Sequence, residues 1–223
     1  MAYAERSRRW PAPALAVVVV VFLAYSLPPY FTGGTRVPAT FGLQYPLLVA
    51  HVMFATVAMV TAVAQIWPGL RAARPGLHRR MGRAYVYTAI PAAVCAMVIG
   101  AATPFGPFLA VSNVLLASLW LWFTINGYRQ RRYAQHRRHM VLSATLALSI
   151  ITNRIWTPVL VVSFQSLQDT VFGGGEEHFI WFVAGVGAWL GWAIPFGTVR
   201  WWLNRNTVMP PSSISQLSDT QRV

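Results

Sequence analysis

The sequence has no lysine, only five acidic residues and a single cysteine, Cys95, in 223 residues. One cysteine excludes a disulfide framework and a cysteine-based metal site. All five acidic residues lie outside the long apolar runs, so no pair of carboxylates is available there to relay protons, and proton-coupled transport is disfavoured. There is also no phosphate-cradling glycine loop, no nucleophile elbow and no HExxH motif, which argues against soluble-type hydrolysis.

Apolar residues are what the chain has in abundance. They make up 56% of it, and the mean hydropathy is +0.47, more than the core of a soluble protein of this size needs. A membrane-spanning helix takes roughly 20 residues, so the chain can hold about six spans with short connections. We therefore predict an all-α, polytopic membrane helical bundle that forms a single domain over residues 1–203.

The apolar runs place the six predicted spans at residues 11–27, 45–67, 85–102, 108–125, 140–164 and 179–203. The first run follows three arginines and resembles a signal peptide in length and charge. It ends in Ala-Tyr-Ser-Leu-Pro-Pro, a poor cleavage site, so we expect a retained span. Residues 204–223 contain two prolines and several serines and are expected to form a disordered cytoplasmic tail.

Arginine distribution predicts the orientation. The formal charge of +13 would suggest nucleic acid as the partner of a soluble protein, but these arginines flank apolar runs, so anionic lipid headgroups are the expected partners. Sixteen of the 18 arginines fall on one side of the predicted spans, and the exceptions are Arg36 and Arg154. By the positive-inside rule that side and both termini are cytoplasmic, in a multi-pass protein of the inner (plasma) membrane.

Arg154 is the costly residue, because a guanidinium at the centre of a span costs on the order of 2.5 to 3.5 kcal/mol. Either it reaches outward to an acidic residue or a lipid phosphate, or it belongs to a buried polar site. His51 and Asn113 have a comparable depth in their own spans, so an outer cluster with Asn153 and Arg154 is possible if these helices are neighbours. The alternative for His51 is a single imidazole bonded to a nearby carbonyl.

A second group of polar residues lies at the predicted cytoplasmic ends. Spans three and five both begin there, so His78 and His136 could approach one another. The alternative is a solvated basic belt on lipid headgroups. The other polar candidates of this group are Gln65, Arg71, Arg79, Tyr85 and His139.

Helical spacing supports an inward-facing polar side on two spans. At 100° per residue, His136 and Arg154, eighteen residues apart, project from one side of a helix, and His51 and Gln65, fourteen apart, differ by about 40°. A helix side that is polar at both ends and apolar between them is expected to face the inside of a bundle.

The block Pro75-Gly-Leu-His-Arg-Arg-Met-Gly-Arg-Ala-Tyr85, with His51, Gln65 and Arg71 before it and His136-Arg-Arg-His-Met140 and Arg154 after it, resembles the uncharacterised bacterial membrane proteins grouped as domain of unknown function 2306. The similarity covers residues 51–158. The family usually ends its last helix with an asparagine and an acidic residue, which this chain lacks in residues 192–200. The resemblance implies a membrane protein and brings no activity.

Three functions are compatible with these patterns, and the sequence does not decide whether the protein is an enzyme. The first is a redox-linked protein that binds haem b or a quinone, with His78 and His136 as axial ligands and Arg154 or Arg79 pairing with a propionate, because imidazoles on separate helices are what a b-type haem requires. The second is an accessory or scaffold subunit of a larger membrane complex. The third is an organic-anion carrier that uses Arg154.

Overall fold

The computed structural model describes residues 11–35 and 37–205, and within them it contains helices and no strands. The long helices are α4 (Gln44–Ile66), α6 (Pro75–Ala101), α7 (Pro107–Arg129), α8 (Tyr133–Phe164) and α10 (Glu176–Arg205). The shorter ones are α2 (Pro11–Ser26), α3 (Pro28–Phe31), α5 (Pro68–Ala73) and α9 (Leu167–Thr170). The predicted all-α membrane bundle is confirmed.

Five helices within the described residues are long and apolar enough to cross a membrane: α4, α6, α7, α8 and α10. The helix α2 covers most of the first predicted span but has 16 residues, about 24 Å at 1.5 Å per residue, against a hydrocarbon core of about 30 Å. Within the described residues, the bundle therefore has five helices long enough to span the membrane and one shorter apolar helix.

Helices α6 and α8 begin well before the apolar runs that predicted them. The segments 75–84 and 133–139 are rich in arginine but helical, because arginine is a good helix former and Pro75 occupies the first turn of α6, where a missing N–H costs nothing. Hydropathy therefore predicts where a helix leaves the hydrocarbon core, but it does not predict where the helix itself ends. Helix α10 continues to Arg205, into the first two residues of the predicted tail, and residues 206–223 lie outside the described part.

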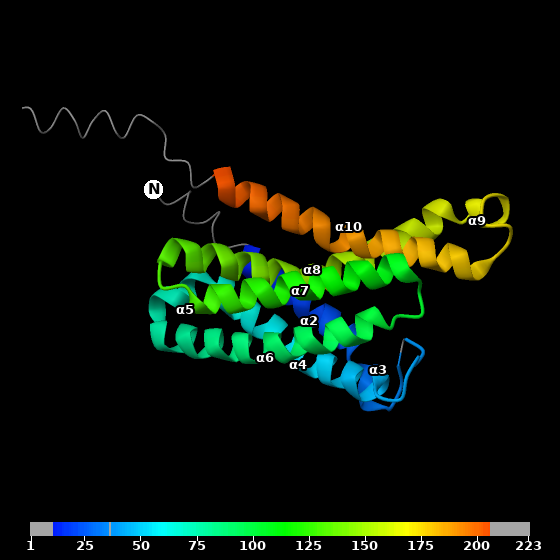
Figure 1. Ribbon diagram of the computed structural model, residues 1–223. Coiled ribbons are helices and arrows are strands. Elements are labelled where there is room, and N and C mark those ends of the chain that lie inside the picture. The colour runs from blue at the N-terminus through cyan, green and yellow to red at the C-terminus, as the bar shows by residue number, and fades with distance from the viewer. Residues whose placement is uncertain (1–10, 36, 206–223) are drawn as a thin grey trace, which may run out of the picture.

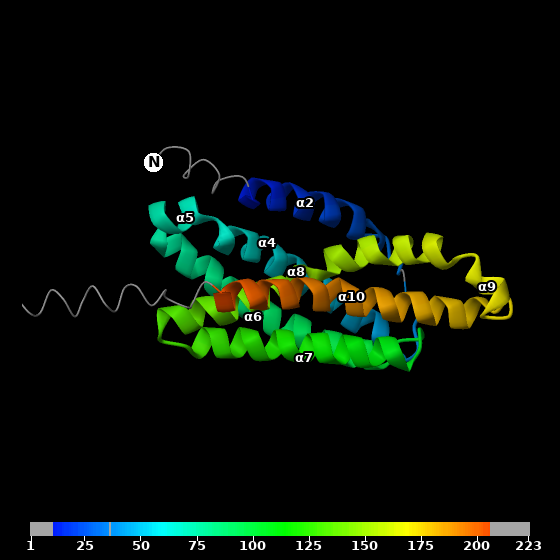
Figure 2. The same cartoon turned by 90° about the horizontal axis from the view of Figure 1, so that it is seen from above.

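Figures 1 and 2 show α4, α6, α7, α8 and α10 packed together in a bundle, with α2 on the outside of α4. Helix α10 packs on α7 and α8, and α2 packs mainly on α4. Small residues allow these close approaches: a Cβ built on Gly191 would lie 2.8 Å from Asn153, and one on Gly100 would lie 2.7 Å from the Cβ of Asn113.

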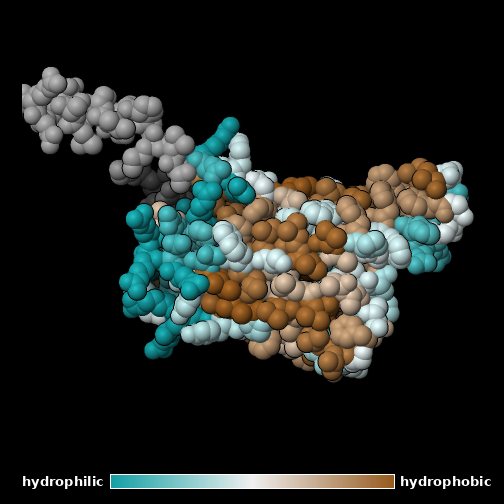
Figure 3. Space-filling view, viewed as in Figure 1, coloured by the Kyte–Doolittle hydropathy of each residue, from teal (hydrophilic) through white to brown (hydrophobic). Residues whose placement is uncertain are grey.

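The two ends of the bundle differ in charge. Figure 3 shows a hydrophilic end and an apolar belt beside it. We call the first the Arg-rich end, and its described arginines are Arg71, Arg74, Arg79, Arg80, Arg83, Arg129, Arg131, Arg132, Arg137, Arg138, Arg200 and Arg205. The opposite end carries Asp169, Glu176 and Glu177 and is called the acidic end. Exposed aromatic side chains near the Arg-rich end, including Trp67, Trp201 and Trp202, are typical of a membrane interface.

Helices α8 and α10 extend past the other helices at the acidic end (Figure 1). A Cβ on Gly185 of α10 would touch Phe108, the second residue of α7, so the part of α10 before Gly185 extends past the start of α7. This projection has its own small core of Leu160, Phe179 and Val183, against which Phe164, Phe172 and Phe182 pack. We call residues 161–184 the arm.

Candidate functional site

A cavity of about 1550 Å³ lies at the Arg-rich end, between α4, α6 and α8. Small side chains leave this space, among them Ala62 on α4, Gly82 on α6 and Ala144 on α8. Apolar walls come from α2 and α10 through Leu15, Val18 and Val199. The polar lining residues are Gln65, Arg71, His78, Arg79, Arg80, Arg83, Tyr85, Tyr128, Gln130, Tyr133, His136, Arg137, Thr145, Ser149 and Thr152.

His136 is held in a defined orientation at this cavity. Its Nδ1 lies 2.7 Å from the carbonyl oxygen of Gly127 at the end of α7, and because a carbonyl only accepts, Nδ1 carries the proton. A neutral imidazole in this tautomer leaves Nε2 as a free acceptor or metal ligand. Gly127 itself is packed closely against α8, since a Cβ there would lie 2.6 Å from the sulfur of Met140.

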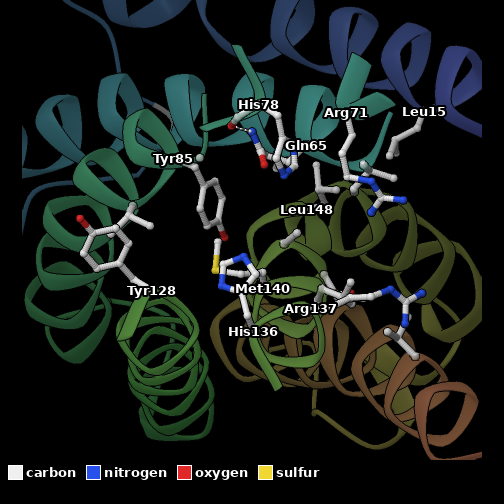
Figure 4. A pocket seen from close by; sticks show the side chains of 18 of the residues that line it. Leu15, Gln65, Arg71, His78, Tyr85, Tyr128, His136, Arg137, Met140 and Leu148 are labelled. Atoms are coloured by element: carbon white, nitrogen blue, oxygen red, sulfur yellow. Dashed lines mark hydrogen bonds between the residues drawn. The ribbon is translucent and has the colours of Figure 1, made fainter. Parts of the chain in front are cut away.

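His78 enters the same cavity from α6. Figure 4 shows the side chains of His78 and His136 reaching into one space, with Tyr85 beside them. The Nδ1 atom of His78 is buried and has no hydrogen-bond partner among the described residues. Its backbone is fixed, because the Nε2 of Gln65 on α4 donates to the His78 carbonyl oxygen at 2.7 Å. An unpartnered buried imidazole nitrogen is a group that a ligand could satisfy.

The cavity is electropositive. Five of its lining residues are arginines, and none of the lining residues in the described part of the chain is acidic. Arg71 donates to the hydroxyl of Tyr133 at 3.3 Å, and the guanidinium of Arg137 lies 5.7 Å from the centre of the Trp202 ring. Cations without a compensating carboxylate favour an anion, and apolar walls favour a ligand that also has an apolar body.

Tyr85 lines the cavity, is only 1% exposed and belongs to a closed ring of hydrogen bonds. The indole Nε1 of Trp120 donates to the Tyr85 hydroxyl at 3.1 Å. Tyr85 then donates to Ser143 at 2.6 Å, Ser143 donates to Thr124 at 2.7 Å, and Thr124 donates to the Trp120 carbonyl at 2.7 Å. This order satisfies every donor, so the ring ties α6, α7 and α8 together and the Tyr85 proton is engaged.

The predicted outer cluster is not assembled. The Nδ1 of His51 lies 2.8 Å from the Ala92 carbonyl oxygen, the ordinary structural role considered as its alternative. Asn113 packs against Gly100 of α6, whereas Asn153 packs against Gly191 of α10, so the two asparagines contact different helices. Arg154 is exposed on α8 and does not line the cavity. Arg154 and His136 have the spacing of residues on one side of a helix, but that side of α8 is exposed at Arg154.

His139 also lies outside the cavity. Its Nδ1 lies 2.8 Å from the Gln135 carbonyl oxygen, and its ring lies 5.6 Å from Trp122 and 5.8 Å from Phe123, centre to centre. The second predicted group is brought together without it: His78, His136, Gln65, Arg71, Arg79 and Tyr85 all line the one cavity.

Sequence reasoning missed the partners of Tyr85. Ser143 and Thr124 lie in apolar runs, where a hydroxyl residue most often bonds to its own helix, and only their facing positions on α7 and α8 reveal the ring. Arg80, Arg83 and Arg137 lie beside the predicted histidines but were not among the predicted site residues, and they line the cavity as well.

No group of three or more histidine, cysteine or acidic side chains in the described part of the chain could hold a bare metal ion. A haem needs fewer protein ligands, because the porphyrin supplies four of the six. The two histidines of the cavity are therefore compatible with haem iron.

A family model described as a predicted membrane protein (DUF2306) matches residues 48–192. The matched region contains α6, α7 and α8 entirely, most of α4, and α10 as far as Trp192. No curated protein and no solved structure matches the chain.

Proposed function

The chain belongs to the DUF2306 family of predicted membrane proteins, and we propose that it is a membrane haem protein in which His78 and His136 ligate the iron of a b-type haem. The family description names no activity, so the proposal rests on the cavity. The observation that carries it is that imidazoles from two different helices, α6 and α8, line one cavity at the Arg-rich end. Axial ligands on separate helices are how bundles hold a b-type haem.

The state of the two imidazoles supports this role. Metal-ligating histidines donate their second ring N–H to a carbonyl or carboxylate, which fixes the ring and raises its basicity. His136 already makes this bond to Gly127. His78 has a buried Nδ1 without a partner among the described residues, which leaves that imidazole free to turn toward a ligand.

The rest of the lining suits an amphipathic dianion such as haem. Arg71, Arg79 and Arg137 are available for the propionates, with which guanidinium groups form charge-assisted hydrogen bonds. Leu148, Val18 and Val199 supply apolar surface for the porphyrin. The volume of about 1550 Å³ exceeds the roughly 300–1,000 Å³ of ordinary small-molecule sites, so size is no obstacle.

A bound haem would supply one-electron chemistry, and the chain's own residues would tune it. The carbonyl of Gly127 holds the proton of His136 Nδ1 and so keeps Nε2 aimed away from α7. Uncompensated arginines near the iron favour the reduced, more negative state of the site. The ring of hydrogen bonds around Tyr85 fixes the relative positions of α6, α7 and α8.

The absorption spectrum of the purified protein tests the proposal. The protein is expressed in haem-supplied cells, extracted in mild detergent and measured before and after reduction with dithionite. A Soret band that shifts on reduction, together with sharp visible bands of a six-coordinate haem, is expected. A purified, folded protein without a Soret band would refute haem binding.

A quinone is the second candidate for the same cavity. The observation that favours it is the combination of Gln65 and His78 on one wall with apolar residues of α2 and α10 on the others. Amide and imidazole groups can donate to the quinone oxygens, and the apolar walls suit its tail. Organic extraction of the purified protein would then yield about one quinone per chain, with no Soret band.

The accessory-subunit and carrier hypotheses make separate predictions. An accessory subunit should co-purify with partner proteins, and a protein that runs alone after mild extraction speaks against that role. A carrier that uses Arg154 should lose uptake in Arg154→Gln at unchanged expression. Arg154 does not line the cavity, so the cavity does not support this carrier.

A further inference from the structure

Arg154 on α8 is an exposed cation within a helix that crosses the membrane. It has no hydrogen-bond or ion-pair partner among the described residues. The described acidic residues, Asp169, Glu176 and Glu177, all lie in the arm. A guanidinium beside lipid must find an anion, so the depth of Arg154 decides which anion can reach it.

The distance from Arg154 to the end of α8 is greater than the depth of Arg154 in the membrane. Arg154 lies ten residues from the end of α8, but the last residues of α8 belong to the arm, which projects past the other helices. The membrane boundary is set by the connections of the bundle, because irregular backbone such as residues 103–106 cannot face hydrocarbon. The end of α8 therefore lies beyond the hydrocarbon.

Contacts between helices give the depth directly. Gly191 of α10 faces Asn153, and its neighbour Trp192 donates to Ser112 of α7 at 3.0 Å, so Arg154 is level with Ser112. From Ser112 to the start of α7 at Pro107 the distance is about 8 Å at 1.5 Å per residue. An arginine side chain that extends toward the surface reaches the headgroup phosphates from this level.

The chain near Arg154 also leaves polar groups unpaired, as expected close to the headgroup region of a membrane. Pro158 lies inside α8 and has no N–H, so it cannot donate to the carbonyl of Arg154, four residues earlier. Leu23 of α2 and Ile150 of α8 both pack against the cluster of Val19, Met59 and Val63. One turn past these contacts, α2 ends at Ser26, whose hydroxyl oxygen is buried and has no partner among the described residues.

We propose that Arg154 binds the phosphate of a phospholipid in the leaflet at the acidic end. The guanidinium donates to the phosphate oxygens, as in other charge-assisted arginine–phosphate pairs. The acyl chains run toward the middle of the membrane along α2, where Val17, Val20 and Val21 are more than 60% exposed. This site lies at the opposite end of the bundle from the cavity and is independent of any haem.

Native mass spectrometry of the full chain, released from detergent after addition of phospholipid, tests this site. The wild type is expected to retain one phospholipid, and Arg154→Gln to bind it about tenfold to a hundredfold more weakly, the loss expected for a hydrogen bond to a charged group. Arg154→Lys keeps the charge and should retain intermediate binding. Arg132→Gln, an exposed arginine at the Arg-rich end, is the matched control and should bind like the wild type.

Three outcomes would overturn the proposal. The first is equal lipid retention by the wild type and Arg154→Gln. The second is displacement of the ligand by millimolar inorganic phosphate, which would identify a free-anion site. The third is a co-purifying membrane protein that only Arg154→Gln loses, which would assign the arginine to a partner's carboxylate. If Arg154→Gln does not fold, the phosphorus content of extensively washed wild type decides, with about one phospholipid per chain expected and none contradicting the site.

Discussion

The hydroxyl of Thr152 on α8 donates to the carbonyl oxygen of Gly191 on α10, and it shares its one proton with the carbonyl oxygen of Ser149 in its own helix. The Gly191 carbonyl needs a donor from outside its own helix, because residue 195, four positions later, is a proline without an N–H. Thr152 thus repairs the break that Pro195 makes in α10, and Gly191 lets the two helices come close enough for it to do so.

Thr152→Val is expected to leave the Gly191 carbonyl unpaired and to lower the free energy of unfolding by about 1–2 kcal/mol. Pro195→Ala restores an N–H within α10, so the cost of Thr152→Val should fall sharply in that background. A double-mutant cycle of thermal stability in detergent measures this coupling. Thr145→Val serves as control, because Thr145 bonds to Val141 in its own helix, and additive effects of Thr152→Val and Pro195→Ala would contradict the account.

Gly191 and Gly197, both on α10, are predicted to respond oppositely to alanine. A Cβ on Gly191 would lie 2.8 Å from the Cα and Cβ of Asn153, so Gly191→Ala should push α8 and α10 apart and cost about 1–3 kcal/mol. Nothing lies within 4 Å of a Cβ on Gly197, so Gly197→Ala should be neutral or stabilising by up to about 1 kcal/mol. Melting temperatures in detergent compare the two, and equal destabilisation would show that the α8–α10 contact is looser than described.

Tyr85→Phe is expected to open the ring of hydrogen bonds. Removing the hydroxyl leaves the Trp120 N–H without its acceptor and should cost about 1–3 kcal/mol. Tyr87→Phe is the matched control two residues along α6, because that side chain is 63% exposed. Chemical unfolding followed by tryptophan fluorescence suits this test, and similar losses in both variants would argue against the ring.

The helices were predictable from the sequence because a run of about 20 apolar residues has few alternatives to a span. The ends of the helices were not predictable, since Arg79 and Arg137 lie in helical segments whose low hydropathy is typical of loops. The convergence of His78 and His136 followed from both helices starting at one end. The depth of Arg154 could not be predicted from the sequence, because no local feature of the sequence indicates that α8 continues past the membrane as part of the arm.

Orientation is a further prediction. The positive-inside rule places the Arg-rich end, and with it the cavity, in the cytoplasm. A green fluorescent protein fused after residue 223 should fluoresce, because it folds in the cytoplasm, and an alkaline phosphatase fused at the same point should be inactive. The reverse pattern would place the cavity on the other side of the membrane.

The central claim is that His78 and His136 hold one haem in the cavity. The most direct measurement is the haem-to-protein ratio, read together with the spin state of the iron, in purified wild type, His78→Leu, His136→Leu, the double variant and His139→Leu. We predict about one haem per chain in the wild type and in His139→Leu, because His139 lies outside the cavity. Each single variant should lose the low-spin signature, and the double variant should lose the haem. A wild type without haem, or a double variant that keeps it in the low-spin state, would contradict the claim.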